Sequence, residues 1–309
     1  SKQMYKSLFI VFLMFSTISL SQEITVEKIW KEYQFFGANV SGFRSMKDGI
    51  HFTKRSKVSD NVCITKHMFA EPNSEGEILV NLTELSLNEK TVKIDDYEFN
   101  EDESKILFST ETEGIYRRSF FANYLLYDLT TKKLTSLDDS RSPQMLAEYS
   151  PDGKKVSFIF ENNLFVKDLA SNQISQLTSD GKKNSTLNGS TDWVYEEEFA
   201  ITKAYGWSPD SKNVAFMRFD ESAVKEFTMT YFYELYPALY PFKYPKAGED
   251  NSKVTVHIVN IASGNKERLT LGDYEYIPRM KWSGNENTLI IQTLNRHQND
   301  LKYHKVNME

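Results

Sequence analysis

Residues 149–158 read YSPDGKKVSF and residues 207–216 read WSPDSKNVAF, two copies of one pattern. Each copy has an aromatic residue, turn residues with one or two charges, and then an alternating or continuous apolar run, which is typical of a turn entering a strand. Weaker copies begin at Phe99 (FNEDESKILF) and at Trp282 (WSGNENTLII). The successive starts lie 50, 58 and 75 residues apart, so the chain repeats a unit built from short strands.

A second pattern follows three of these turns and reads as strand, polar turn, strand: NYLLYDLTTKKLTSL from Asn123, NLFVKDLASNQISQLT from Asn163 and VTVHIVNIASGNKERLT from Val254. Several antiparallel strands per repeat, without a convincing long amphipathic helix, predict an all-β chain folded as a β-propeller with one sheet per blade. Further strand-like runs near residues 49–54 and 77–87 bring the expectation to about four to five blades. A β-sandwich is the alternative.

The two ends of the chain carry separate predictions. Lys2 and Lys6 precede an apolar stretch over residues 8–20, which is too short for a comfortable membrane span and is typical of a secretory signal. We expect a signal peptide over 1–21 and an incomplete propeller over 22–309, with an uncleaved N-terminal anchor as the alternative. The protein is then expected to be periplasmic or secreted, and free of the membrane after cleavage. The chain stops directly after a strand-like run, LKYHKV, and open sheet edges favour aggregation, so we expect a fragment of a longer propeller.

Composition excludes several classes of function. The formal net charge is −6, or −8 without Lys2 and Lys6, and no basic patch with interleaved aromatic residues occurs, so nucleic acid is not an expected partner. Cys63 is the only cysteine, which rules out an intrachain disulfide and predicts a buried thiol. No G-x-S-x-G elbow, P-loop, dinucleotide fingerprint or H-E-x-x-H motif is present. No catalytic residue can therefore be nominated in this chain, and no cofactor or metal is expected.

The stretch 191–200, TDWVYEEEFA, is the candidate binding site. Its three consecutive glutamates lie among aromatic residues, which raise the cost of keeping neighbouring carboxylates ionised. On a strand Glu197 and Glu198 would point to opposite faces, whereas on a short helical turn they lie about 100° apart and can reach one ligand. An ammonium group, which has three donors, suits such a pair. A solvated charged face is the alternative interpretation.

The run 188–199, NGSTDWVYEEEF, resembles the dipeptidyl peptidase IV family of serine peptidases. The similarity continues through YRRSFFANYLLYDL (116–129), EYSPDGKKVSFIFENNLFVKDL (148–169), AYGWSPDSKNVAFMRFDES (204–222) and YPKAGEDNSKVTVHIVN (244–260). The resemblance implies an eight-bladed propeller that caps an α/β-hydrolase domain, the latter absent from this chain. It also implies an enzyme that removes dipeptides from free N-termini, usually where proline or alanine is second.

The resemblance assigns roles residue by residue. Glu197 and Glu198 would grip the substrate's α-ammonium, and Glu196 would point elsewhere. Arg117, at the family's spacing before the Tyr-Asp-Leu of residues 127–129, would bind the substrate carbonyl and help to hold the glutamates, and Arg118 fits that spacing less well. The catalytic serine, aspartate and histidine of the family would lie beyond residue 309, so the chain alone is expected to be inactive.

Two further segments stand outside the blade pattern. Thr230–Gly248 is rich in tyrosine and proline, and in the family this region projects as an arm that contacts a second subunit, so we expect a homodimer. A long solvated loop is the alternative. Residues 25–33, TVEKIWKEY, predict a short helix whose Val26, Ile29 and Trp30 face a core against the absent hydrolase domain.

The combined prediction is the substrate-gating propeller portion of a secreted or periplasmic serine dipeptidyl peptidase. Its partners would be peptides with a free N-terminus, and it would release X-Pro or X-Ala dipeptides. The alternative is a non-catalytic propeller that binds peptides or amines, either an inactive homologue or a TolB-like periplasmic protein.

Overall fold

The computed structural model describes residues 23–37, 42–284 and 287–308, so the predicted signal peptide over 1–21 lies outside the described residues. It divides the chain into two compact units, Ser1–Phe43 and Arg44–Glu309. The predicted domain bounds, 1–21 and 22–309, stay a prediction. Among the described residues, no helix has both the length and the apolar composition that crossing a membrane requires.

The first unit contains the expected short helix, α2 (Val26–Trp30). Thr25 caps it by accepting a hydrogen bond from the Lys28 N–H through its side chain, as an N-cap threonine commonly does. The helix buries none of its residues, and Val26 and Trp30 are 69% and 66% exposed. The packing of this helix against a core therefore remains a prediction.

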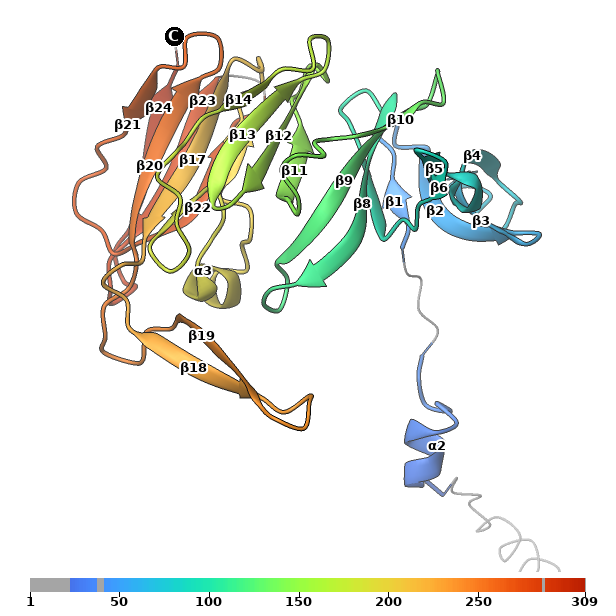
Figure 1. Cartoon of the computed structure of the whole chain (residues 1–309), viewed down its shortest axis with the longest axis horizontal. Helices are drawn as coiled ribbons and strands as arrows, with labels where there is room; N and C mark the ends of the chain where they lie inside the picture. Colours follow the sequence, from blue (N-terminus) through green and yellow to red (C-terminus); the bar gives the residue numbers. More distant parts are fainter. Residues whose placement is uncertain (1–22, 38–41, 285–286, 309) are drawn as a thin grey trace, which may run out of the picture. The chain divides into compact units, whose positions relative to one another are not determined.

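The second unit is a series of antiparallel sheets, as the sequence repeats predict (Figure 1). Three of the sheets have four strands that pair in chain order: β1 (Arg44–Ser45), β2 (His51–Val58), β3 (Asn61–Met68) and β4 (Glu77–Asn81); β7 (Asp96–Phe99), β8 (Lys105–Gly114), β9 (Phe120–Asp128) and β10 (Leu134–Ser136); β11 (Met145–Tyr149), β12 (Lys155–Phe160), β13 (Asn163–Asp168) and β14 (Ile174–Gln176). Short elements follow the first of them: η1 (Leu82–Glu84), β5 (Ser86–Leu87) and β6 (Lys90–Thr91).

The fourth sheet is larger and carries two insertions, the helix α3 (Trp193–Glu198) and a two-stranded hairpin. Its strands are β15 (Thr186–Asn188), β16 (Tyr205–Trp207), β17 (Asn213–Asp220), β20 (Lys253–Asn260) and β21 (Lys266–Arg268); the hairpin is β18 (Glu226–Tyr231) and β19 (Ala238–Lys243). The fifth sheet has β22 (Tyr276–Trp282), β23 (Thr288–Leu294) and β24 (Leu301–Asn307). Within the described residues these sheets confirm an all-β, partial propeller of four to five blades.

The repeated Ser-Pro-Asp turn has one geometry in two blades. In the third sheet the Ser150 hydroxyl lies 2.6 Å from Asp152 Oδ1, which also accepts a 3.1 Å hydrogen bond from the Lys154 N–H. Ser208 and Asp210 repeat these contacts in the fourth sheet at 2.6 and 3.1 Å. Such side-chain bonds to the backbone favour a tight turn over continued strand pairing. The turns therefore set where each blade's second strand begins.

The core lies between neighbouring sheets, because the central strands are apolar on both faces. In β8, Ile106 and Phe108 pack in the layer shared with the first sheet, and Leu107 packs in the layer shared with the third. Alternate side chains of a strand point to opposite faces, so a continuous apolar run fills two layers. The predicted buried thiol is confirmed, since Cys63 is 1% exposed and free.

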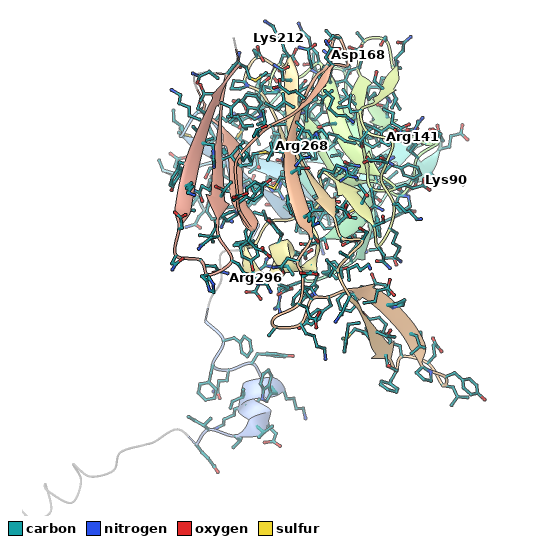
Figure 2. The ribbon with its side chains drawn as sticks, turned by 90° about the vertical axis from the view of Figure 1, so that its left-hand side faces the viewer. Lys90, Arg141, Asp168, Lys212, Arg268 and Arg296 are labelled. Carbon is teal, nitrogen blue, oxygen red and sulfur yellow. The ribbon has the colours of Figure 1, made fainter. Side chains whose placement is uncertain are left out.

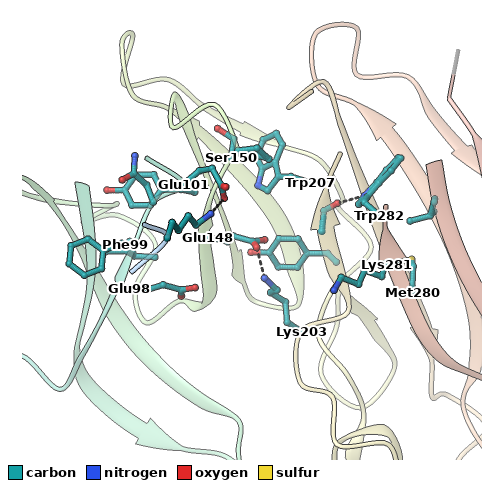
Figure 3. Close-up of a pocket in the computed structure, with 18 residues that line it drawn as sticks. Glu98, Phe99, Glu101, Glu148, Ser150, Lys203, Trp207, Met280, Lys281 and Trp282 are labelled. Atoms are coloured by element: carbon teal, nitrogen blue, oxygen red, sulfur yellow. Dashed lines mark hydrogen bonds and ion pairs between the residues drawn. The ribbon is translucent and has the colours of Figure 1, made fainter. Parts of the chain in front are cut away.

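The first strands of successive sheets border a common cavity of about 540 Å³ (Figure 3). Glu98 comes from β7, Glu148 from β11, Trp207 from β16 and Trp282 from β22. Glu148 forms a 2.6 Å ion pair with Lys203, and burial raises the pKa of Glu98. The sequence did not predict that Glu98 and Glu148 border one cavity, because acids in the first strands of separate blades share no motif.

Candidate functional site

Helix α3 is positioned by an interruption in the first strand of the fourth sheet. β15 and β16 pair with different halves of β17, at Asn188 opposite Arg218 and at Tyr205 opposite Phe216. Between them the chain leaves the sheet edge, forms α3 and returns, and a bridge between Ser190 and Lys203 joins the two ends of the excursion. The predicted short helical turn is therefore present, held at both ends by one sheet.

Asp192 begins the helix and is 6% exposed. Its Oδ1 accepts a 3.0 Å hydrogen bond from the Tyr195 N–H, the usual contact of an N-cap aspartate, and its Oδ2 accepts a 2.6 Å bond from the Ser252 hydroxyl. Burial raises the pKa of Asp192, and these two hydrogen bonds oppose the shift by favouring the ionised form. Because Ser252 directly precedes β20, the start of the helix is tied to a second strand of the same sheet.

Tyr195 ties the helix to the fifth sheet. Its ring is 1% exposed and packs edge-on against Phe219 with 4.8 Å between centroids, and its hydroxyl accepts a 2.9 Å hydrogen bond from the Ile277 N–H. At the other end of the helix, Arg279 Nη1 donates a 2.9 Å hydrogen bond to the Phe199 carbonyl. The helix is therefore clamped between two neighbouring sheets.

The three glutamates have three different environments. Glu196 is 0% exposed, and its Oε1 accepts hydrogen bonds from the backbone N–H groups of Arg118 (2.6 Å) and Ser119 (2.9 Å). Glu197 is partly buried, with a side chain 17% exposed, and Glu198 is exposed. Successive helical residues are about 100° apart, so one short helix aims consecutive carboxylates in separate directions.

Arg117 meets Glu197 across 80 positions of sequence. Its Nε lies 3.0 Å from one carboxylate oxygen and 2.9 Å from the other, while its own side chain is 68% exposed. Glu198 forms no hydrogen bond or ion pair within the part of the chain that the structure describes. The structure therefore brings two of the three predicted residues, Arg117 and Glu197, into contact, and places Glu198 next to Glu197 on the same helix.

This arrangement leaves one carboxylate charge unbalanced. Arg117 offsets one of the two negative charges on Glu197 and Glu198, so the group carries a net charge of about −1 when all three are ionised. Such a group can accept hydrogen bonds from one monovalent cation with several donors. The described residues contain no set of three or more His, Cys, Asp or Glu side chains arranged to hold a metal ion.

Sequence reasoning missed the residues that hold the helix. An aspartate directly before a helical turn is a recognised N-cap signal, so Asp192 could have been found from the sequence. Ser252 and Ile277 could not, because they are 60 and 82 positions from their partners, and no local pattern links them.

Known proteins resemble this chain in sequence and in fold. Residues 100–309 match the family described as "Dipeptidyl peptidase IV (DPP IV) N-terminal region". The rat protein named "Inactive dipeptidyl peptidase 10" is 31% identical over 253 residues, which is 78% of this chain and 31% of that protein. The "Probable dipeptidyl-aminopeptidase B" of Talaromyces marneffei is 35% identical over 202 residues, 60% of this chain and 22% of that protein.

The solved dipeptidyl peptidase 4 of Porphyromonas gingivalis superposes with a TM-score of 0.84 at 36% identity, covering 93% of this chain and 41% of that one. The chain thus spans less than half the length of the relatives that it matches. Since the family match covers residues 100–309 and includes both the hairpin of Arg117 and the helix of the three glutamates, this chain belongs to the dipeptidyl peptidase IV family and contains sheets of its N-terminal propeller region.

Proposed function

We propose that this chain is the substrate-gating portion of a serine dipeptidyl peptidase that releases X-Pro or X-Ala dipeptides from peptides with a free N-terminus. Glu197 and Glu198 bind the substrate's α-ammonium, and Arg117 holds Glu197 and reaches the substrate carbonyl. The observation that carries the proposal is the Arg117–Glu197 ion pair beside Glu198, whose carboxylate has no partner among the residues that the structure describes. The catalytic serine, aspartate and histidine would be supplied by residues outside this chain.

In the proposed mechanism, the amine site determines which peptide bond of the substrate is cleaved, counted from the substrate's N-terminus. Two carboxylates at fixed positions bind the ammonium, so the bond that follows the second residue is the one presented to a nucleophile. Hydrogen bonds to charged groups contribute about 1.5–3 kcal/mol each. Glu197, whose side chain is 17% exposed, would lose this partner with an analogue that lacks the charge, so the site would reject such analogues.

The test compares two substrates in the full-length protein. An Ala-Pro chromogenic substrate and its N-acetylated form are assayed with the wild type, with Glu197→Ala and with Glu267→Ala, which removes an exposed glutamate from β21. We expect the wild type and Glu267→Ala to cleave only the free-amine substrate efficiently, and Glu197→Ala to lose most of that activity. Equal cleavage of the acetylated substrate by the wild type would refute amine gating.

A non-catalytic role is the second candidate function, because a relative of similar identity is named an inactive dipeptidyl peptidase. Such a protein would keep the amine site and bind peptides without cutting them. Titration of the full-length protein with the tripeptide Ala-Pro-Ala, which has a bond after its second residue, separates the candidates: binding without release of Ala-Pro supports the inactive homologue. The match to a dipeptidyl peptidase IV N-terminal region favours these two candidates over the TolB-like alternative.

We also propose that the β18–β19 hairpin is a dimerisation arm. It stands away from the stacked sheets (Figure 2), and its tip exposes large apolar side chains by 77% to 90% of their surface: Phe232, Tyr233, Leu235 and Tyr236. Exposed aromatic residues in one patch are typical of protein interfaces.

Export to the periplasm or beyond is proposed on the predicted signal alone, and cell fractionation tests it.

A further inference from the structure

The hairpin loop that carries Arg117 is held to helix α3 by Glu196. This loop, residues 115–119, joins β8 to β9. Glu196 Oε1 accepts hydrogen bonds from two successive backbone N–H groups, those of Arg118 at 2.6 Å and Ser119 at 2.9 Å. In return, Arg118 Nη1 donates a 2.7 Å hydrogen bond to the Glu196 carbonyl. Three hydrogen bonds therefore join one glutamate to the residues that directly follow Arg117.

The Arg117–Glu197 pair by itself would not fix the loop. The arginine side chain is 68% exposed, and exposed ion pairs contribute little because water screens them and the side chains lose freedom. Glu196 is in the opposite situation, since it is 0% exposed. Charge-assisted hydrogen bonds in a buried site are strong and directional, so they fix backbone position in a way that the surface pair cannot.

Hydrogen bonds within the loop close its turn but do not connect it to helix α3. The Tyr116 N–H donates to the Ser119 hydroxyl at 3.2 Å, and the Ile115 N–H donates to the Ser119 carbonyl at 2.8 Å. These bonds close the turn and leave the Arg118 and Ser119 N–H groups directed at Glu196 Oε1. The second oxygen of Glu196 has no hydrogen-bond partner among the described residues, so one oxygen makes both backbone contacts.

We propose that Glu196 is a positioning residue: it holds the 115–119 loop against α3 so that Arg117 meets Glu197 and the two outward glutamates present a preformed amine site. The consequence for catalysis rests on the proposed function, whereas the consequence for the loop does not. Glu196 would not touch the substrate, because it is 0% exposed.

Two measurements on the full-length protein test this inference. The first is amide hydrogen exchange of the peptide that contains Arg118 and Ser119, in the wild type, Glu196→Ala and Glu196→Gln. We expect faster exchange in Glu196→Ala and near wild-type exchange in Glu196→Gln, whose amide oxygen can still accept both N–H groups. Unchanged exchange in Glu196→Ala would overturn the proposal, whatever the protein's activity.

The second measurement is a double-mutant cycle on kcat/KM for the free-amine Ala-Pro chromogenic substrate. Glu196→Ala is expected to lower kcat/KM by about tenfold or more, mostly through KM, while Glu196→Gln stays within about threefold of wild type. In an Arg117→Ala background, Glu196→Ala should add little, because the residue whose position it sets is already gone. Full additivity would indicate a general structural defect and would overturn the positioning role.

Asp138→Ala is the matched control. Asp138 is another buried carboxylate, with a side chain 7% exposed, and it accepts hydrogen bonds from the Ser140 N–H at 2.9 Å and from Arg141 Nη1 at 2.7 Å. Its loss should lower stability without changing exchange at Arg118 and Ser119. If the wild type proves indifferent to substrate acetylation, the proposed function fails while the exchange result still decides the role of Glu196 in holding the loop.

Discussion

Two insertions leave the fourth sheet, and they differ in what holds them. Helix α3, between β15 and β16, is anchored by three buried polar side chains: Asp192, Tyr195 and Glu196. The β18–β19 hairpin, between β17 and β20, carries apolar side chains that are largely exposed at its tip. Both emerge from the same end of the sheet (Figure 1), so their place in the fold does not explain the difference.

The comparison shows how one sheet can support two kinds of surface. Hydrogen bonds to buried groups are directional, and they fix the helix to within the distances that recognition of a small charged group requires. Apolar contact is non-directional, so an exposed aromatic arm adapts to a large complementary surface. The two insertions meet at the base of the hairpin, where the Trp193 and Tyr244 rings lie 4.4 Å apart between centroids.

The largest effect is expected from Glu198→Ala, because this carboxylate is exposed and unpaired within the described residues. Its loss should reduce kcat/KM for the free-amine Ala-Pro chromogenic substrate by about 10- to 100-fold, as expected for losing a hydrogen bond to a charge. Thermal unfolding should be unchanged. Steady-state kinetics and a melting curve of the full-length protein check both, and a lowered melting midpoint would contradict a purely ligand-binding role.

Glu221, at the base of the hairpin, should make stability fall as the pH rises. It is 5% exposed, and burial together with Asp192 raises its pKa from 4.5 to about 7, although Lys243 opposes the shift. A carboxyl whose pKa is higher in the folded state stabilises the fold below its unfolded pKa, and this contribution is lost as the pH rises from 4.5 through 7. Glu221→Gln should therefore be more stable than the wild type at pH 8, by about 2–3 kcal/mol, and close to it near pH 4.5.

Denaturant unfolding of the wild type and of Glu221→Gln across this pH range measures the difference. A stability difference that does not change with pH would mean that Glu221 ionises normally in the folded protein.

Tyr195→Phe should weaken the attachment of helix α3 to the fifth sheet. The change keeps the ring and removes the hydroxyl that accepts from the Ile277 N–H, which leaves a buried donor unpaired. The free energy of unfolding should fall by about 1–2 kcal/mol. The matched control is Tyr303→Phe, at a tyrosine that is 66% exposed and should tolerate the change. Equal effects of the two variants would show that the Ile277 contact contributes nothing.

The smallest effect on the stability of the fold is expected in the arm. Replacing both Tyr233 and Leu235 with serine should change the unfolding free energy of the subunit by less than about 0.5 kcal/mol, because both side chains are exposed. Sedimentation velocity should nevertheless show a shift from dimer to monomer. A wild-type protein that sediments as a monomer would remove the dimerisation proposal, and an unchanged dimer in the variant would place the interface elsewhere.

The fold class could be predicted because its signals are local. Ser150 and Asp152 bond to their own turn, and so do Ser208 and Asp210, so the turn is specified by the residues that form it. The strands that follow are apolar on both faces, which is typical of sheets stacked on sheets. The hairpin strands of the arm were not predicted, because their exposed aromatic residues do not alternate with a buried face.

The repeated turns, the strands of the blades and the three adjacent glutamates can be recognised in the sequence. The different roles of these glutamates follow from the fold: Glu196 is buried against a loop 77 to 78 positions away, Glu197 meets Arg117, and Glu198 has no partner within the described residues. A carboxylate's environment is set by groups within a few ångströms, and here those groups come from another blade, the sheet of β7 to β10, and not from residues near in sequence.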